Sequence, residues 1–100
     1  MSRYARRRDD AEPAIVAALR QVGASVQTLD ETGAPDLLVG FRNATYLLEV
    51  KDTHGQCGKG RRRTESGLRE SQEVWWATWK GPPPQIVTNA LEALKAIGAL

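Results

Sequence analysis

The sequence predicts an α/β domain whose elements follow the order αβββαβα. Residues 37–50 contain two apolar runs around a polar turn, a pattern typical of a β-hairpin. Segments before and after this hairpin carry apolar residues at helical spacing, which favours amphipathic helices on both sides of it. A short apolar segment, Gln85 to Val87, then predicts one more strand before a final helix.

The first helix is expected to begin near Asp9 and to end at Gly23. Pro13 is acceptable in its first turn because the amide hydrogen there has no intrahelical acceptor, and Gly23 suits the position after a helix end. One apolar stripe at i, i+3, i+4 and i+7 must face a core: Ile15, Ala18, Leu19 and Val22. Residues 24–29 are the expected first strand, and residues 30–34 form a turn into the hairpin.

Charged residues lie at the open end of the hairpin. If Arg42 and Asn43 form a two-residue loop, antiparallel pairing puts Asp36 roughly opposite Glu49, with Cβ atoms about 5 Å apart. Lys51 points to the same face as Glu49, because side chains alternate along a strand. Like carboxylates at that distance repel unless a cation holds them, and hard divalent ions take carboxylate oxygens. The alternative is an ordinary hairpin whose terminal charges are solvated.

A second helix-forming pattern runs from Leu68 to Lys80. Gln72 interrupts its apolar stripe, and because a buried amide needs hydrogen-bond partners, Gln72 is expected to point at a polar site. Trp75 and Trp79 are expected to cover the sheet, and Trp76 is the tryptophan expected to be partly exposed. Gly81 and three prolines end this helix. Thr88 or Asn89 is then expected to cap a final helix that carries Leu91, Leu94 and Ile97.

Length and composition fit one soluble domain. The chain has 100 residues, of which 41% are hydrophobic and 26% charged, which is an ordinary globular composition. No apolar run approaches the roughly 20 residues that a bilayer requires, and the first ten residues lack the apolar core of a signal peptide. The single cysteine agrees with a reducing compartment. We therefore expect a cytoplasmic protein with no membrane contact.

Basic residues are bunched although the formal net charge is only +2. Residues 1–8 are expected to form a flexible basic tail, and residues 52–67, which are rich in glycine and arginine, a mobile basic loop. Such clusters are the usual footprint of a phosphate-backbone partner, and the alternative is a pair of solvated segments that keep the protein soluble. The residues expected to contact nucleic acid are Arg6, Arg7, Arg8, Lys59, Arg61, Arg62 and Arg63.

The hairpin also carries a family resemblance. Pro35-Asp36 followed by Glu49-Val50-Lys51 resembles the signature of the PD-(D/E)XK nucleases, and GAPDLLVG with LLEVKD is similar to the VRR-NUC and Holliday-junction-resolvase branches. The resemblance implies a restriction-endonuclease-like αβββαβ core, with a central mixed sheet flanked by helices and a C-terminal helix added. It further implies an endodeoxyribonuclease that uses Mg²⁺ or Mn²⁺, acts on branched or Holliday-junction DNA as a homodimer, and belongs to a phage or mobile element.

In the resembled family, the acids equivalent to Asp36 and Glu49 bind Mg²⁺, and the carbonyl of the residue equivalent to Val50 often adds a ligand. Lys51 would then orient the attacking water or stabilise the phosphate charge. Gln72 matches a glutamine within a Q-x-x-W pattern and is expected to act beside the metal. The alternative for Gln72 is a satisfied glutamine at a helix interface.

Glu12 is the candidate for a further metal ligand. Resolvase relatives carry a glutamate in the first helix, and Glu12 stands eleven residues before Gly23. The alternative is an acid favoured by the dipole of the helix regardless of function, and Asp9 and Asp10 share that argument.

Three other hypotheses remain. The chain could be a general nicking or restriction-type nuclease, a catalytically silent nucleic-acid-binding module of the same fold, or a structural protein whose basic clusters bind the acidic surface of a partner. A zinc site built on His54 and Cys57 is not expected, because two ligands do not make a tetrahedral site.

Overall fold

The computed structural model describes residues 10–51 and 70–100. Within these residues the chain forms an α/β domain with three helices and a four-stranded mixed sheet, which confirms the predicted class and element order. The elements are α1 (Glu12–Gln21), β1 (Ser25–Thr28), β2 (Leu37–Phe41), β3 (Ala44–Val50), α2 (Glu70–Thr78), β4 (Gln85–Val87) and α3 (Ala90–Ala96).

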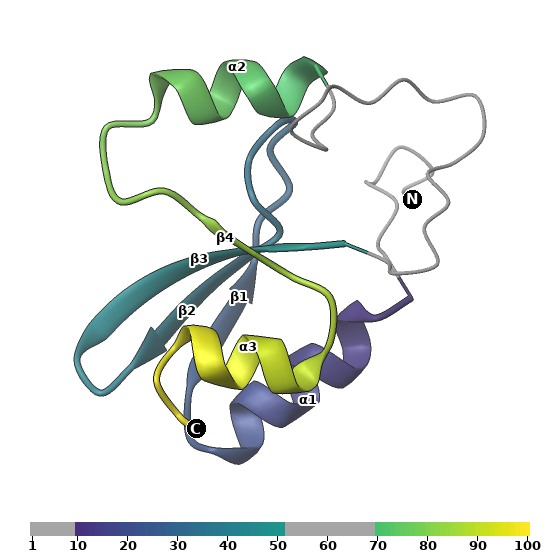
Figure 1. Ribbon diagram of the computed structural model, residues 1–100, viewed down its shortest axis with the longest axis vertical. Coiled ribbons are helices and arrows are strands. Elements are labelled where there is room, and N and C mark those ends of the chain that lie inside the picture. The colour runs from purple at the N-terminus through teal and green to yellow at the C-terminus, as the bar shows by residue number, and fades with distance from the viewer. Residues whose placement is uncertain (1–9, 52–69) are drawn as a thin grey trace.

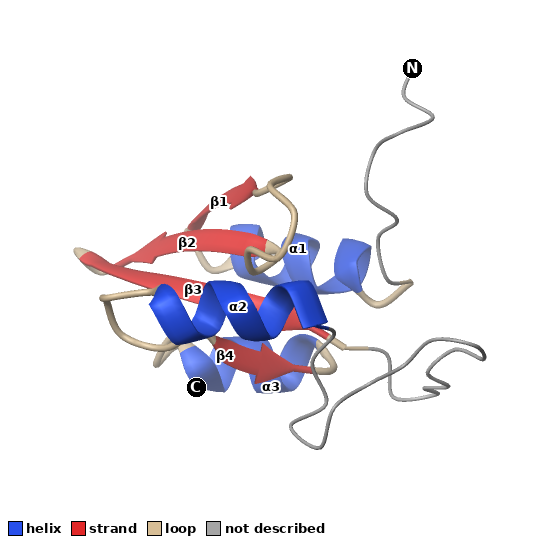
Figure 2. Ribbon diagram, turned by 90° about the horizontal axis from the view of Figure 1, so that it is seen from above, coloured by secondary structure: helices blue, strands red, loops and turns tan. Residues whose placement is uncertain are grey.

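The sheet has the strand order β1-β2-β3-β4, which can be followed in Figure 2. β1, β2 and β3 pair antiparallel, and β4 pairs parallel to β3. A parallel neighbour needs a long crossover connection, and here that connection contains α2. Helix α2 covers one face of the sheet, and α1 and α3 lie together against the other face (Figure 1). The result is a three-layer arrangement with two distinct helix-to-sheet interfaces.

The hydrophobic core lies between the sheet and the α1–α3 layer. Alternation along β2 and β3 turns Leu37 and Leu48 to this face, where both are fully buried. They pack with the buried faces of α1, α3 and the neighbouring strands, which contribute Ile15, Leu19, Ala24, Val26, Val39, Val50, Val87, Ala93 and Ile97. Polar residues on the opposite sheet face therefore lie outside the core, on the side covered by α2.

Two residues of the predicted apolar stripes are exposed. Val22 is 40% exposed because α1 ends at Gln21 and Val22 is its C-cap. Leu91 is 52% exposed, since α3 buries Ala93 and Ile97 and a residue two positions before Ala93 points away from that face. The apolar stripes predicted the helices correctly, but each stripe included one residue that is exposed in the structure.

The helix ends agree with the predicted capping residues. Pro13 lies in the first turn of α1, and Gly23 follows that helix with a φ of +93°. The N–H of Ala24 then donates to the carbonyl of Leu19 at 3.0 Å, as in a Schellman ending. Asn89 caps α3 by accepting from the N–H of Glu92 at 2.8 Å.

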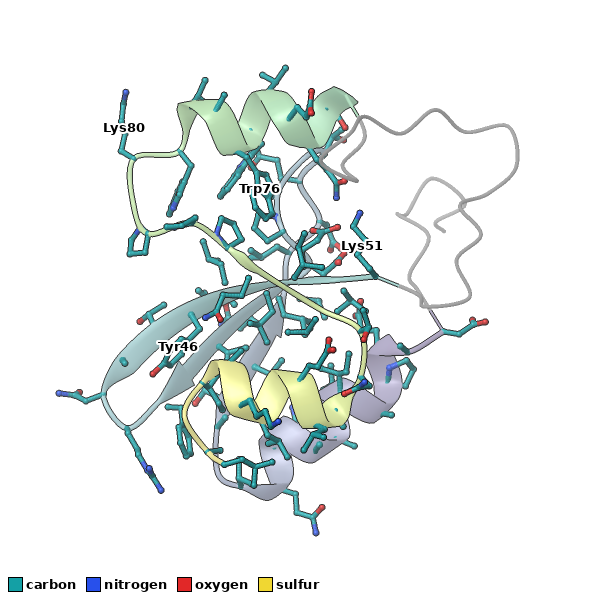
Figure 3. All side chains as sticks on the ribbon, viewed as in Figure 1. Tyr46, Lys51, Trp76 and Lys80 are labelled. Carbon is teal, nitrogen blue, oxygen red and sulfur yellow. The ribbon has the colours of Figure 1, made fainter. Side chains whose placement is uncertain are left out.

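The prediction that Trp79 covers the sheet is wrong. Trp79 is 42% exposed; its ring stacks on that of Trp75, with 4.7 Å between centroids, and its indole N–H donates to the carbonyl of Pro82 at 2.9 Å. Trp76 instead lies between α2 and the sheet (Figure 3), with its indole nitrogen buried. Trp76 follows Gln72 by one helical turn, so the inward position of Gln72 sets this phase.

Several predictions concern residues outside the described ranges. The expected basic tail (1–8), the expected basic loop (52–67) and the expected helix start at Leu68 belong to this group. The expected start of the first helix near Asp9 is wrong: Asp10 and Ala11 form a turn and α1 begins at Glu12, since Pro13 has no N–H to donate one turn back. In the described ranges, no helix is long and apolar enough to cross a membrane.

Candidate functional site

Three polar side chains are buried where β2 begins and β3 ends. Asp36 is 8% exposed, Glu49 is 3% exposed and Gln72 is 4% exposed. Acidic side chains are almost never buried unless they are paired or bind a cation. The sheet face beneath α2 therefore carries a cluster of buried polar side chains.

The hairpin turn brings the two acids together. Arg42 and Asn43 both have positive φ values, +50° and +68°, as a two-residue type I′ loop requires. The resulting register pairs Leu37 with Leu48, so the next position along each strand places Asp36 beside Glu49. Both acids point to the α2 face because the two leucines point to the core. This register confirms the predicted juxtaposition of the two acids.

Asp36 also closes the end of the β2–β3 ladder. The N–H of Lys51 donates to Val87 on β4, so the N–H and carbonyl of the preceding Val50 point toward β2. The residue of β2 that would continue the ladder there is Pro35, which has no N–H. The Asp36 carboxylate (Oδ2) accepts the N–H of Val50 at 2.8 Å instead. Pro35 cannot donate to the carbonyl of Val50, which leaves that oxygen without a ladder bond from β2 at the edge of the site.

Gln72 joins the two ends of an acid–lysine pair. Its amide nitrogen Nε2 donates to Glu49 Oε2 at 2.5 Å, and its oxygen Oε1 accepts from Lys51 Nζ at 3.3 Å. Lys51 Nζ also lies 3.4 Å from Glu49 Oε2. Lys51 stands at the end of β3 and extends toward α2 (Figure 3). The amide therefore matches a donor to the carboxylate and an acceptor to the ammonium, and this fixes the relative position of the three side chains.

The electrostatics of the site centre on Glu49. Burial, followed by the nearby Asp36 carboxylate, raises the pKa of the Glu49 carboxyl from 4.5 to about 7. Lys51 and the hydrogen bond from Gln72 act in the opposite direction but only partly compensate. An acid whose charge is disfavoured by its surroundings is typical of functional sites.

One oxygen of Glu49 has no hydrogen-bond partner. Within the described residues, Glu49 Oε1 and Trp76 Nε1 are the two buried side-chain polar atoms without one. A buried carboxylate oxygen that accepts nothing is costly, so this oxygen can take a partner that residues 10–51 and 70–100 do not supply. Carboxylate oxygens are ligands that hard divalent cations prefer.

The remaining predicted site residues are Glu12, which the structure describes, and residues that lie outside the described ranges. Glu12 is the first residue of α1 and is 6% exposed. No group of three or more His, Cys, Asp or Glu side chains able to hold a metal ion occurs in residues 10–51 and 70–100, so Glu12 as a ligand stays a prediction. The seven basic residues expected to bind nucleic acid, and both His54 and Cys57, lie outside the described ranges.

Two contributions to the site were missed by sequence reasoning. The missing N–H of Pro35 leaves the Val50 carbonyl free of a ladder bond, and the signal for this was the register together with the proline. Gly33 packs against α2, and its signal was a glycine in a short turn directly before the hairpin.

Comparisons of the chain with protein-family models, curated proteins and solved structures found no match.

Proposed function

We propose that this chain is a divalent-metal-dependent DNA endonuclease with the restriction-endonuclease-like fold of the PD-(D/E)XK nucleases. The observation that carries the proposal is the buried pair Asp36 and Glu49, with an unpartnered oxygen on Glu49 and Lys51 beside it. A binding-only surface has no need to assemble two repelling acids in a buried position. The match of these residues to the PD and EVK motifs supports the same conclusion.

The donors of the site fit Mg²⁺ or Mn²⁺. Asp36, Glu49 and the carbonyl of Val50 would hold the cation, all through oxygen atoms, which these ions prefer. Asp36 Oδ2 already accepts from the N–H of Val50, and Glu49 Oε2 accepts from Gln72, so the chain itself orients both carboxylates. When bound, such a cation supplies charge neutralisation at the phosphate and an activated water.

Lys51 and Gln72 orient the reacting groups and hold the acidic site in its geometry. Lys51 presents an ammonium group that can donate to a phosphate oxygen or to the attacking water, and its contact with Glu49 keeps it at the edge of the acid pair. Gln72 holds Lys51 and Glu49 in place through one amide. Ordered donors of this kind stabilise charge that develops during reaction without reorganising at that moment.

The substrate within this proposal is branched DNA, specifically the four-way junction, cut by a homodimer. Support comes from the similarity of GAPDLLVG and LLEVKD to the resolvase and VRR-NUC branches. A two-fold dimer presents two identical sites, which suits symmetric cuts on two strands.

The test incubates the protein with an end-labelled four-way junction and a matched linear duplex, in Mg²⁺, in Mn²⁺ and in EDTA. Glu49→Gln is the inactive variant, and Glu92→Gln, an exposed acid in the first turn of α3, is the matched control. Metal-dependent symmetric cuts on the junction, absent only in Glu49→Gln, are expected. Cleavage of both substrates would make the protein a general nuclease, and binding without cleavage would favour the silent binding module.

A further inference from the structure

The turn between β1 and β2 requires a glycine at position 33. The N–H of Ala34 donates to the carbonyl of Glu31 at 3.0 Å, which closes a four-residue turn with Gly33 as its third member. Gly33 has a φ of +88°, the left-handed conformation that this position of a type II turn demands. Three residues later the same segment presents Asp36, so the turn is the direct lead-in to the site.

Gly33 also meets the backbone of α2. A Cβ atom built on Gly33 would lie 2.6 Å from the carbonyl oxygen of Ser71 and 3.4 Å from the Cβ of Trp75. Heavy atoms closer than 3.0 Å to a Cβ are essentially never found in proteins. The atom in the way belongs to a helix backbone and not to the end of a flexible side chain. The turn and α2 can lie this close only because residue 33 has no side chain.

The position of Ser71 sets the position of Gln72. The carbonyl of Ser71 and the N–H of Gln72 belong to one planar peptide unit, so a push on that oxygen moves the start of Gln72. The hydrogen bond from Lys51 Nζ to Gln72 Oε1 is already 3.3 Å long. A shift of about 0.5 Å would take it past the distance at which a hydrogen bond is counted.

We propose that Gly33 is a positioning residue: its backbone contact with Ser71 seats α2 at the depth at which Gln72 bridges Glu49 and Lys51. The inference rests on the proposed function of the site for its consequence in catalysis, but the contact itself is independent of that function. The turn thus positions two residues of the site: Asp36, which follows it in the sequence, and Gln72, through the contact of Gly33 with α2.

The perturbation is Gly33→Ala, and Gly23→Ala is the matched control. Gly23 has a φ of +93°, close to that of Gly33, but a Cβ built on it meets nothing within 4 Å. Both variants carry the cost of alanine in the left-handed region, whereas only Gly33→Ala pushes on α2. The difference between the two variants therefore measures the effect of the contact between residue 33 and α2.

The first measurement is made on the metal-free protein, by solvent exchange of the side-chain amide of Gln72 in NMR spectra. This signal is assigned by its loss in Gln72→Met. Displacement of Gln72 also weakens the hydrogen bond that its Nε2 donates to Glu49, and the exchange of the amide protons reports that bond. Exchange about tenfold faster is therefore expected in Gly33→Ala, while Gly23→Ala stays close to the parent. Equal exchange in the two glycine variants would overturn the proposal. So would loss of the α1 and β2 core amides in Gly33→Ala alone, because the turn would then hold the whole domain and not α2.

The second measurement is a double-mutant cycle on metal-dependent DNA cleavage. Gly33→Ala is expected to lower kcat in the parent and to have little further effect in Gln72→Met, because the glycine acts through the glutamine. The same fold-loss in both backgrounds would show that Gly33 acts without Gln72 and would overturn the proposal. If the parent cuts no DNA, the proposed function fails, but the exchange measurement still tests whether Gly33 positions α2.

Discussion

Replacing Glu49 by glutamine is expected to stabilise the metal-free protein at alkaline pH. Glutamine keeps the shape of the side chain and the acceptor for Gln72, but it removes the negative charge that burial and Asp36 disfavour. A residue that serves folding alone would not be improved in this way. The prediction therefore separates an acid kept for function from an acid kept for structure.

The magnitude follows from the pKa of Glu49. The carboxyl has a pKa of about 7 in the folded protein and 4.5 ordinarily, and since one pKa unit corresponds to about 1.4 kcal/mol, the ionised group costs about 3 kcal/mol. Because the folded-state pKa is raised, this cost is absent below pH 4.5 and grows as the pH rises to about 7. Glu49→Gln should match the parent at low pH and exceed it by about 3 kcal/mol at pH 8.

The assay is urea unfolding followed by tryptophan fluorescence, in EDTA, from pH 4.5 to pH 8.5. Glu92→Gln is the control of opposite sign. Hydrogen bonds from the backbone N–H and the hydroxyl of Thr88 lower the pKa of Glu92. That variant should be less stable than the parent above the ordinary pKa of a glutamate, with the deficit lost as the pH falls.

Two outcomes would refute the reasoning on Glu49. In one, Glu49→Gln is less stable than the parent at pH 8, which would mean that the charge of Glu49 is better compensated than its burial indicates. In the other, the two proteins differ by the same amount at every pH, so that the effect would come from packing and not from ionisation.

Three further predictions test the site and the core. Lys51→Ala should lower DNA cleavage about 100-fold or more in a gel assay while calorimetry still detects Mn²⁺ binding, and loss of both would make Lys51 structural. Asp36→Ala leaves the N–H of Val50 without its acceptor. It should therefore cost about 1 to 3 kcal/mol in urea unfolding at pH 5, where Glu49 is protonated, and an unchanged midpoint would contradict that hydrogen bond. Leu19→Ala, in the centre of the core, should cost about 2 to 5 kcal/mol by the same method, and a smaller loss would mean that the core collapses around the gap.

The hairpin could be predicted because its signals are local. A two-residue polar turn between apolar runs fixes the register, and the register alone pairs Asp36 with Glu49. The helix-end residues Gly23 and Asn89 could be predicted from the sequence for the same reason, since the conformation of each depends on its own few neighbours.

The inward position of Gln72 on α2 could be predicted, but which tryptophan lies against the sheet could not, because that depends on contacts between distant segments. The apolar stripe of the helix suggested that Trp79 faces the sheet, whereas the polar contacts of Gln72 with Glu49 and Lys51 turn Trp76 inward instead. The backbone contact of Gly33 with α2 likewise joins residues that are far apart in the sequence. Burial of a polar group next to a partner thus outweighed the hydrophobic period.

The measurement that tests the central claim most directly is calorimetric titration of Mn²⁺ into the parent, Glu49→Gln and Glu92→Gln at pH 8. If Asp36, Glu49 and the Val50 carbonyl hold the cation, the parent and Glu92→Gln bind Mn²⁺ and Glu49→Gln binds none. Binding that is unchanged in Glu49→Gln, or absent from the parent, would contradict a metal site at the end of the hairpin.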